Sequence, residues 1–345
     1  MKTFINIVVI LLLGVTTLVN GLNFNKHPVR QEVIDRIKNS NVSWTPFEIE
    51  ENPFKNKSLQ SMRNMGGNLG YIKEESGIQG NIKHLKSKFF QELKKMGHKL
   101  KGEHIHVQDE GLNPKLGASL PTAYNTKTAF PSCPHTILDQ ANCGSCWAHA
   151  AVTMLQNRFC IKSGGSINMQ FSRQDMVSCD LGNAACNGGY LSSSVQYLQT
   201  EGVVSEQCLA YASADGNSVP RCNYRCDDKS LEYKKYGCKY NSMKILTTYE
   251  DIKEEIYTNG PVMVGFVVYD DFSSYSTGIY EVTPDSVEEG GHAVTLNGWG
   301  YDNGRLYWIG QNQWQNTWGE SGFFRIYAGE AGIDLMAFSC EPDLS

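Results

Sequence analysis

The chain has 345 residues and carries 31 lysine and arginine residues against 36 aspartate and glutamate residues, a net charge of −5. This length suffices for two or three structural units, and we expect no nucleic-acid partner. Residues 1–21 combine Lys2 with an apolar run over 4–13 and a small-residue exit, which predicts a cleaved secretory signal. Because that run is too short to span a bilayer and no later stretch approaches the necessary length, we expect no stable membrane insertion. The expected destination is a lysosome-like acidic compartment or the outside of the cell.

The sign of the charge changes near residue 120. Residues 22–119 carry 16 basic and 11 acidic residues, net +5, whereas residues 120–345 carry 14 and 25, net −11. Opposite charges on two parts of one chain favour their association. We therefore interpret 22–119 as a pro-region that inhibits a domain over 120–345 of the same molecule, which we expect to be a monomer.

The pro-region contains no cysteine and has the only two N-glycosylation sequons, at Asn41 and Asn56. Between residues 82 and 100 the apolar positions are spaced by three or four, which predicts an amphipathic helix. Lysines 83, 86, 88, 94, 95 and 99 occupy its other faces. A basic amphipathic helix binds either a membrane surface or an acidic protein face, and here we favour docking on the acidic domain. Residues 111–117 are rich in glycine and proline and are interpreted as a linker open to proteolysis.

Residues 120–345 show two kinds of pattern in succession. The stretch 146–198 is helix-forming, and 248–257 predicts a further helix that stops at an Asn-Gly-Pro sequence. Strand patterns punctuated by glycine follow at 262–269, 292–297, 306–310 and 323–327. The expected fold is therefore α+β, with a helical lobe, a β lobe and a cleft between them.

One short motif, residues 140–147, indicates the chemistry. It places Cys146 at the start of an apolar helical pattern, with Ser145 as the expected N-cap. A thiol at a helix N-terminus lies near free backbone N–H groups and the positive end of the helix dipole, which favour the nucleophilic thiolate. The sequence Cys-Gly-Ser-Cys-Trp is also a known signature of a cysteine nucleophile. The alternative is two structural cysteines near a tight turn.

The cysteine count is odd. All 11 cysteines lie between Cys133 and Cys340, so one catalytic thiol leaves ten, enough for five disulfides in an oxidising compartment. Two alternatives remain open: an inactive homologue that acts as a binding protein, and a zinc site that uses the C-x₂-C pair Cys143 and Cys146. An even disulfide count argues against zinc, and we expect neither a metal nor a cofactor.

A cysteine nucleophile needs an imidazole that takes its proton and later protonates the leaving amine. After residue 120 the candidates are His135, His149 and His292. His135 follows Cys133 in a loop-like stretch and is expected at the surface. His149 is tied to the same helix as Cys146, whereas His292 opens a strand of the other lobe and can face the thiol across a cleft. We therefore expect His292 to be the base, because the members of such a site meet in space and not in sequence.

From residue 120 onward the chain resembles the papain family of cysteine peptidases, and within it cathepsin B. The resemblance is carried by the nucleophile motif and by segments 186–190, 259–262, 290–293 and 312–324. Residues 27–67 resemble the short cathepsin B pro-peptide. The resemblance implies a two-lobed papain-like fold with a β-barrel-like lobe, and a cysteine endopeptidase of protein and peptide substrates that is made as a zymogen.

Residue by residue, the resemblance makes Cys146 the nucleophile, His292 its ion-pair partner, Asn312 the group that orients the imidazole, and Gln140 a donor to the oxyanion. It also assigns a set of substrate-binding residues: Gly188 and Gly189 on the substrate wall, Trp314 shielding the imidazole, Trp318 on the leaving-group side, and Met336 at the floor of the main specificity pocket. An apolar Met336 implies a preference for a hydrophobic residue two positions before the scissile bond.

The sequence departs from the family pattern at four places. Ala141, His149 and Gln313 stand where glycine, phenylalanine and serine are usual, and none of them is expected to touch a reacting atom. The fourth departure is the segment 208–222, which is short and lacks the paired histidines of the cathepsin B occluding loop. This loss implies an open leaving-group side and an endopeptidase.

The same resemblance implies the disulfide pairing. Four pairs match family pairings, and the two remaining cysteines are expected to bond to each other. The five pairs are Cys133–Cys160, Cys143–Cys186, Cys179–Cys222, Cys208–Cys226 and Cys238–Cys340.

Overall fold

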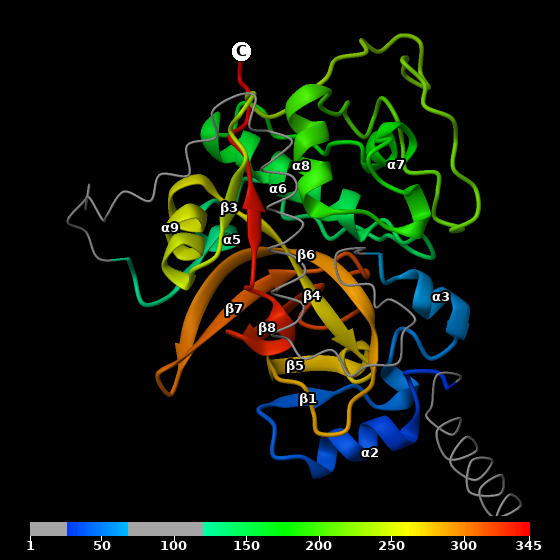
Figure 1. Ribbon diagram of the computed structural model, residues 1–345, viewed down its shortest axis with the longest axis vertical. Coiled ribbons are helices and arrows are strands. Elements are labelled where there is room, and N and C mark those ends of the chain that lie inside the picture. Colours follow the sequence, from blue (N-terminus) through cyan, green and yellow to red (C-terminus); the bar gives the residue numbers. More distant parts are fainter. Residues whose placement is uncertain (1–25, 68–119) are drawn as a thin grey trace, which may run out of the picture.

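The computed structural model describes residues 26–67 and 120–345, and Figure 1 shows two lobes with the start of the chain packed along one side. Helices gather in one lobe and a large sheet makes up the other. Each lobe has its own cluster of buried apolar side chains. None of the helices in the described part of the chain is both long and apolar enough to cross a membrane.

The helical lobe is built around one buried helix, α6, at Cys146–Lys162. Every residue of α6 from Cys146 to Cys160 is buried, as expected for a helix enclosed on all sides by the core. The helices near it are α5 (Thr126–Ala129), α7 (Arg173–Cys179), the 3-10 turn η3 (Ala185–Asn187) and α8 (Leu191–Thr200). Helix α9 (Tyr249–Asn259) packs against both α6 and the sheet.

The β lobe is formed by a nine-stranded sheet with the order β1-β5-β8-β7-β6-β4-β9-β3, and β2 pairs with β6 beside this path. The strands are β1 (Trp44–Pro46), β2 (Tyr124–Asn125), β3 (Lys244–Leu246), β4 (Val262–Tyr269), β5 (Tyr275–Tyr280), β6 (Glu288–Asp302), β7 (Arg305–Gln311), β8 (Phe323–Tyr327) and β9 (Ala337–Ser339). The sheet is not closed, because β1 and β3 are its two ends among the described strands. The barrel-like lobe expected from the resemblance is thus an open sheet.

The elements predicted from periodicity agree closely with the structure. Strands β4 and β8 have the expected bounds, β6 and β7 extend further than expected, and α9 begins one residue after the predicted start. Thr248 caps α9 by accepting the N–H of Asp251 across 3.1 Å. The α+β architecture with successive helical and β lobes is confirmed.

The described start of the chain, residues 26–67, lies against the β lobe and the junction of the lobes. It forms α2 (Gln31–Asn39), β1, the 3-10 turn η1 (Ile49–Glu51) and α3 (Leu59–Asn64). Strand β1 adds an edge to the sheet by pairing with β5, and Trp44 lies opposite Gly278. Gly278 has φ +107, and a Cβ there would meet the carbonyl of Ser43 at 2.5 Å. Only glycine permits this close approach of the two strands.

The sequence also predicts two glycosylation sites, a signal, a lysine-rich helix and a linker in the first 119 residues. Asn41 and Asn56 are both exposed, so the two sequons are accessible. The signal at 1–21, the lysine-rich segment around 82–100 and the linker at 111–117 lie outside the described residues.

Five disulfides join the pairs implied by the resemblance. They are Cys133–Cys160, Cys143–Cys186, Cys179–Cys222, Cys208–Cys226 and Cys238–Cys340. Cys146 is the one free cysteine in the described residues. Because Cys143 is bonded to Cys186, the C-x₂-C pair is not available for the zinc site considered above.

Candidate active site

Cys146 is the first residue of α6 and is fully buried. Ser145 occupies the expected N-cap position, but its side chain caps no backbone N–H. Its hydroxyl instead lies 3.2 Å from Nδ1 of His149 and 3.0 Å from the Tyr211 hydroxyl. The expected capping bond is therefore wrong, because these two side chains compete successfully for Ser145.

Burial raises the pKa of the Cys146 thiol to about 12, while neighbouring backbone groups of Ala293, Gly67 and Trp147 act in the opposite direction. The lowering expected from the helix N-terminus is thus outweighed, because a charged group taken out of water loses its solvation. Gly67 belongs to the start of the chain. The thiol is neutral while that segment covers it.

His292 lies on β6, and the next residue, Ala293, shares a buried cluster with Cys146. Nε2 of His292 lies 2.9 Å from Oδ1 of Asn312. Because an amide oxygen only accepts, Nε2 carries the hydrogen and donates it. Nδ1 is buried without a hydrogen-bond partner in the described residues, so it is the nitrogen left for the thiol. Trp314 covers the imidazole, with ring centroids 4.7 Å apart.

Burial also lowers the pKa of His292, to about 4, although the bond to Asn312 and the carbonyl of Met65 oppose this. Raising the pKa of the thiol and lowering that of the imidazole both disfavour an ion pair. The buried thiol of Cys146 and the buried imidazole of His292 are therefore both neutral in the covered site.

The other two histidines of residues 120–345 lie elsewhere. His149 is buried, with Nδ1 2.9 Å from the Ser145 carbonyl and its ring edge-on to Tyr211 at 5.0 Å. Burial lowers the pKa of His149 to about 3. His135 keeps part of its side chain exposed, consistent with the expected surface position, and bonds to the Phe130 carbonyl. Both imidazoles are held by local contacts.

Gln140 has both ends of its side-chain amide defined by hydrogen bonds. Its Oε1 accepts from Nε2 of Gln313 across 3.1 Å, and its Nε2 donates to the carbonyls of Cys143 and Met65, at 2.8 and 3.0 Å. Nε2 of Gln313 also donates to the Ala293 carbonyl, at 2.8 Å. These two bonds use both hydrogens of Nε2 of Gln313, so it does not donate to Nε2 of His292, which lies 3.2 Å away. Nε2 of His292 therefore remains the donor to Asn312. Gln313 thus links Gln140 to the strand that carries His292.

Residues 64–67 of the chain lie across this site. The Met65 carbonyl accepts from Gln140, and the Gly67 carbonyl accepts from the backbone N–H of Gly189 across 2.8 Å. The approach is close, because a Cβ on Gly67 would come within 2.5 Å of Gly144 backbone atoms. The segment pairs with the wall of the site by one backbone hydrogen bond, of the kind that an extended peptide makes.

The remaining substrate-binding candidates are Gly188, Trp314, Trp318 and Met336. Gly188 precedes Gly189 with φ +109. Trp314 is buried, with Phe54 of the leading segment edge-on to it at 5.6 Å, and Trp318 packs on Trp314 at 5.2 Å. Met336 is partly buried on the cluster that contains Cys146.

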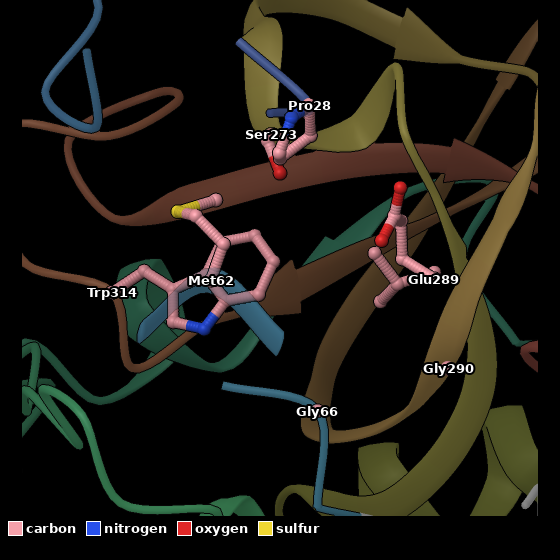
Figure 2. A pocket seen from close by; sticks show the side chains of 8 residues that line it. Pro28, Met62, Gly66, Ser273, Glu289, Gly290 and Trp314 are labelled. Atoms are coloured by element: carbon pink, nitrogen blue, oxygen red, sulfur yellow. The ribbon is translucent and has the colours of Figure 1, made fainter. Parts of the chain in front are cut away.

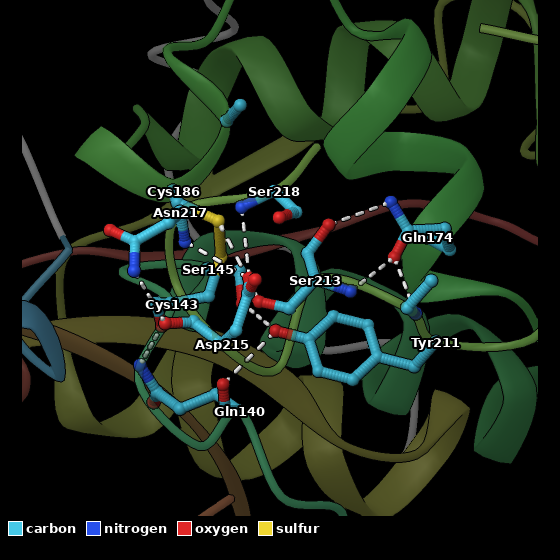
Figure 3. Close-up of a disulfide and its surroundings, with 12 residues drawn as sticks. Gln140, Cys143, Ser145, Gln174, Cys186, Tyr211, Ser213, Asp215, Asn217 and Ser218 are labelled. Carbon is cyan, nitrogen blue, oxygen red and sulfur yellow. Dashed lines mark hydrogen bonds between the residues drawn. A yellow bond between two sulfur atoms is a disulfide. The ribbon is translucent and has the colours of Figure 1, made fainter. Parts of the chain in front are cut away.

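The short segment 208–222 packs on the nucleophile loop, and Figure 3 shows this region around the Cys143–Cys186 disulfide. Tyr211 donates to the Gln140 carbonyl across 3.0 Å, and the Asn142 N–H donates to the Ala214 carbonyl across 3.0 Å. The hydrogen bonds of this segment therefore support the loop that carries the thiol.

The sequence alone did not identify several of these contacts. The sequence marks Gln313 as a departure from the family pattern but does not reveal that it links Gln140 to the His292 strand, and it gives no signal for the contacts of Tyr211 and Met65. The sequence gives one indication of this link, the glutamine at position 313 where serine is usual. A buried amide needs hydrogen-bond partners for both its oxygen and its nitrogen.

Comparisons with known proteins agree on the family. Residues 120–340 match the family described as papain family cysteine protease. The chain is 33% identical to cathepsin B-like cysteine proteinase 5 of Caenorhabditis elegans, over 70% of this chain and 80% of that one. It is 37% identical to cathepsin B of Dictyostelium discoideum, over 64% and 75%. The solved structure of proCathepsin B S9 from Trypanosoma congolense aligns with TM-score 0.72 and 26% identity, over 92% of this chain and 99% of that one.

Proposed function

Since this chain belongs to the papain family and is a cathepsin B-like cysteine peptidase, we propose that Cys146 and His292 are its catalytic pair. We further propose an endopeptidase made as a zymogen: a signal at 1–21, a pro-region at 22–119 and a peptidase domain at 120–345. The observation that carries the assignment is that residues 65–67 contact three buried groups: the free Cys146 through Gly67, and the Asn312-bound imidazole of His292 and the Gln140 amide through Met65.

The proposed chemistry starts when the site is uncovered. His292 takes the proton of Cys146 through Nδ1, and the thiolate sulfur attacks the carbonyl carbon of the scissile peptide bond. The oxygen becomes an oxyanion that accepts from Nε2 of Gln140 and the backbone N–H of Cys146. The C–N bond then breaks as His292 protonates the leaving amine. Water, deprotonated by His292, hydrolyses the thioester and restores the thiol. Asn312 holds the imidazole throughout.

The pro-region is the proposed intramolecular inhibitor. The Met65 carbonyl accepts the hydrogen bond from Nε2 of Gln140 that an oxyanion would otherwise accept. The Gly67 carbonyl likewise accepts the hydrogen bond from the Gly189 N–H that an extended substrate would otherwise accept. The similar solved structure, proCathepsin B S9 from Trypanosoma congolense, is likewise that of a proform. The inhibited state is supported by the opposite pKa shifts of Cys146 and His292, because neither group carries charge while it is covered.

Two features support the proposed specificity. Met336 offers an apolar, deformable surface in the main pocket, which favours a hydrophobic residue two positions before the scissile bond. The segment 208–222 makes its hydrogen bonds to the loop that carries the nucleophile. A short segment held there favours an open leaving-group side of the cleft, and therefore internal cleavage of the substrate. The proposed setting is a secretory-pathway destination, lysosome-like or extracellular, with glycans at Asn41 and Asn56 and the enzyme as a monomer.

Single substitutions test the catalytic pair. Cys146→Ser and His292→Ala are each expected to abolish hydrolysis of a quenched peptide by the matured enzyme. The matched control is His149→Phe, which replaces a buried ring without leaving a cavity and is expected to retain most of the activity. If His149→Phe were as inactive as His292→Ala, the base would be misassigned.

A further inference from the structure

The pro-region places two arginines on one buried carboxylate of the β lobe. Nη2 of Arg36 lies 2.6 Å from Oδ1 of Asp270, and Nη2 of Arg30 lies 2.9 Å from Oδ2. Asp270 is fully buried while these residues cover it. When the pro-region leaves, this carboxylate loses both cations.

Asp270 is part of a set of acceptors arranged around the Arg36 guanidinium. The guanidinium also donates to the Ser286 hydroxyl at 3.1 Å, the Asp285 carbonyl at 3.3 Å and the Thr283 hydroxyl at 3.3 Å. A planar group with five N–H donors needs such acceptors in fixed directions. We call Asp270, Thr283, Asp285 and Ser286 the guanidinium cradle.

The cradle lies on the leaving-group side of the cleft. Phe266 pairs with His292 in the sheet, and Asp270 follows Phe266 by four residues, about 13 Å of extended chain. A substrate pairs with Gly189 before its scissile bond and places its leaving amine at His292. The pro-region runs in the opposite direction, with Arg36 at the cradle, Met65 at His292 and Gly67 at Gly189. Read backward from Gly67, it passes Gly189 and His292 before it reaches the cradle. Residues after the scissile bond therefore run toward Asp270.

A second carboxylate stands between His292 and the cradle. Glu289 lines a cavity of about 20 Å³ with Met62 and Gly66 of the pro-region and with Trp314. Figure 2 shows its carboxylate across the gap from Met62 and Trp314. Burial and then the charge of Asp270 raise the pKa of Glu289 to about 7, whereas Arg63 and Arg30 lower it. Removal of the pro-region thus leaves two acidic groups without the cations that oppose them.

We propose that the cradle and Glu289 form a subsite of the mature enzyme that binds an arginine of the substrate two to four residues after the scissile bond. The inference rests on the proposed function and deepens it, since it names the substrate class on the leaving-group side. Arg36 occupies in the zymogen the place that the substrate guanidinium takes after activation.

Paired peptides test the subsite with the matured enzyme. Each quenched fluorescent peptide has the same residues up to the scissile bond and carries arginine or citrulline, its uncharged isostere, at the second, third or fourth position after it. We expect kcat/KM to favour arginine about fivefold at one or more positions, and this ratio to fall as salt is added. Glu289→Gln and Ser286→Ala are each expected to lower the ratio. Asp270→Asn is expected to bring it near one, provided that the variant matures.

The matched control is Asp228→Asn, which removes an exposed carboxylate and is expected to keep the ratio of the unaltered enzyme. A ratio near one at all three positions would overturn the proposal and leave the cradle as an anchor for the pro-region alone. A ratio that persists in both Glu289→Gln and Ser286→Ala would overturn it as well. If the unaltered enzyme cleaves no citrulline peptide either, the proposed peptidase function fails, and the subsite fails with it.

Discussion

Nε2 of Gln313 donates a hydrogen bond to Oε1 of Gln140 across 3.1 Å, inside the buried site. Since an amide is nearly symmetric in shape, this bond decides which end of Gln140 faces the reacting carbonyl. With Oε1 held by Gln313, the Nε2 donor points to the place now taken by the Met65 carbonyl.

Gln313→Met is therefore expected to lower kcat about fivefold, with a smaller change in KM, because one neutral hydrogen bond contributes about 1 kcal/mol. The loss should stay below the roughly 2.7–4 kcal/mol of removing an oxyanion donor itself. The measurement is steady-state hydrolysis of one uncharged peptide. Gln315→Met, at an exposed glutamine bonded to Asp139, is the control. An equal loss in the control, or a change confined to KM, would contradict the positioning role of Gln313.

Arg36→Gln is expected to speed maturation of the zymogen at neutral pH. In this variant the buried Asp270 carboxylate keeps only Arg30 as a partner cation. The lost charged hydrogen bond weakens the binding of the pro-region to the peptidase domain by about 2 kcal/mol. The rate of conversion from zymogen to mature enzyme measures this. Lys38→Gln is the control, since Lys38 is exposed and pairs with Glu48 of the pro-region itself. Identical conversion rates for both variants would show that Arg36 does not hold the pro-region.

Glu289 predicts a pH dependence of zymogen stability. Its pKa is raised from 4.5 to about 7, first by burial, so between these values the folded zymogen binds more protons than the unfolded chain. The contribution of Glu289 to stability therefore falls as the pH rises from about 4.5 to 7. Glu289→Gln should raise the Tm of the zymogen more at pH 7.5 than at pH 5. Exposed Glu254 replaced by glutamine should show no such difference, and equal Tm changes at both pH values in Glu289→Gln would refute the assignment.

Much of the architecture follows from local pattern. The nucleophile motif predicts a helix beginning at Cys146, and the apolar run at 262–269 predicts β4, because each depends on residues close in the sequence. The sequence also favours His292 over His149, since only the former comes from another lobe. These features need no knowledge of the tertiary packing.

Most of the contacts that the sequence does not reveal join distant segments. Arg36 and Asp270 are 234 positions apart, and Gln140 and Gln313 are 173 apart. The Ser145 side chain was expected to cap its helix, but the approach of Tyr211 and His149 redirects it. Burial likewise reverses the direction of the pKa shift expected for Cys146. Each of these contacts and shifts depends on which parts of the folded chain pack together. The spacing of residues along one segment does not specify this packing.

Cys146 is the proposed nucleophile, and residues 64–67 are proposed to inhibit it by covering it. Alkylation by iodoacetamide at pH 7, followed by intact mass and peptide mapping, tests both parts at once, because only a thiolate reacts quickly. We expect one label, on Cys146, which enters the mature enzyme at least about a hundredfold faster than the zymogen, and no label in Cys146→Ser. Equal rates in zymogen and mature enzyme, or a label on another cysteine, would contradict it.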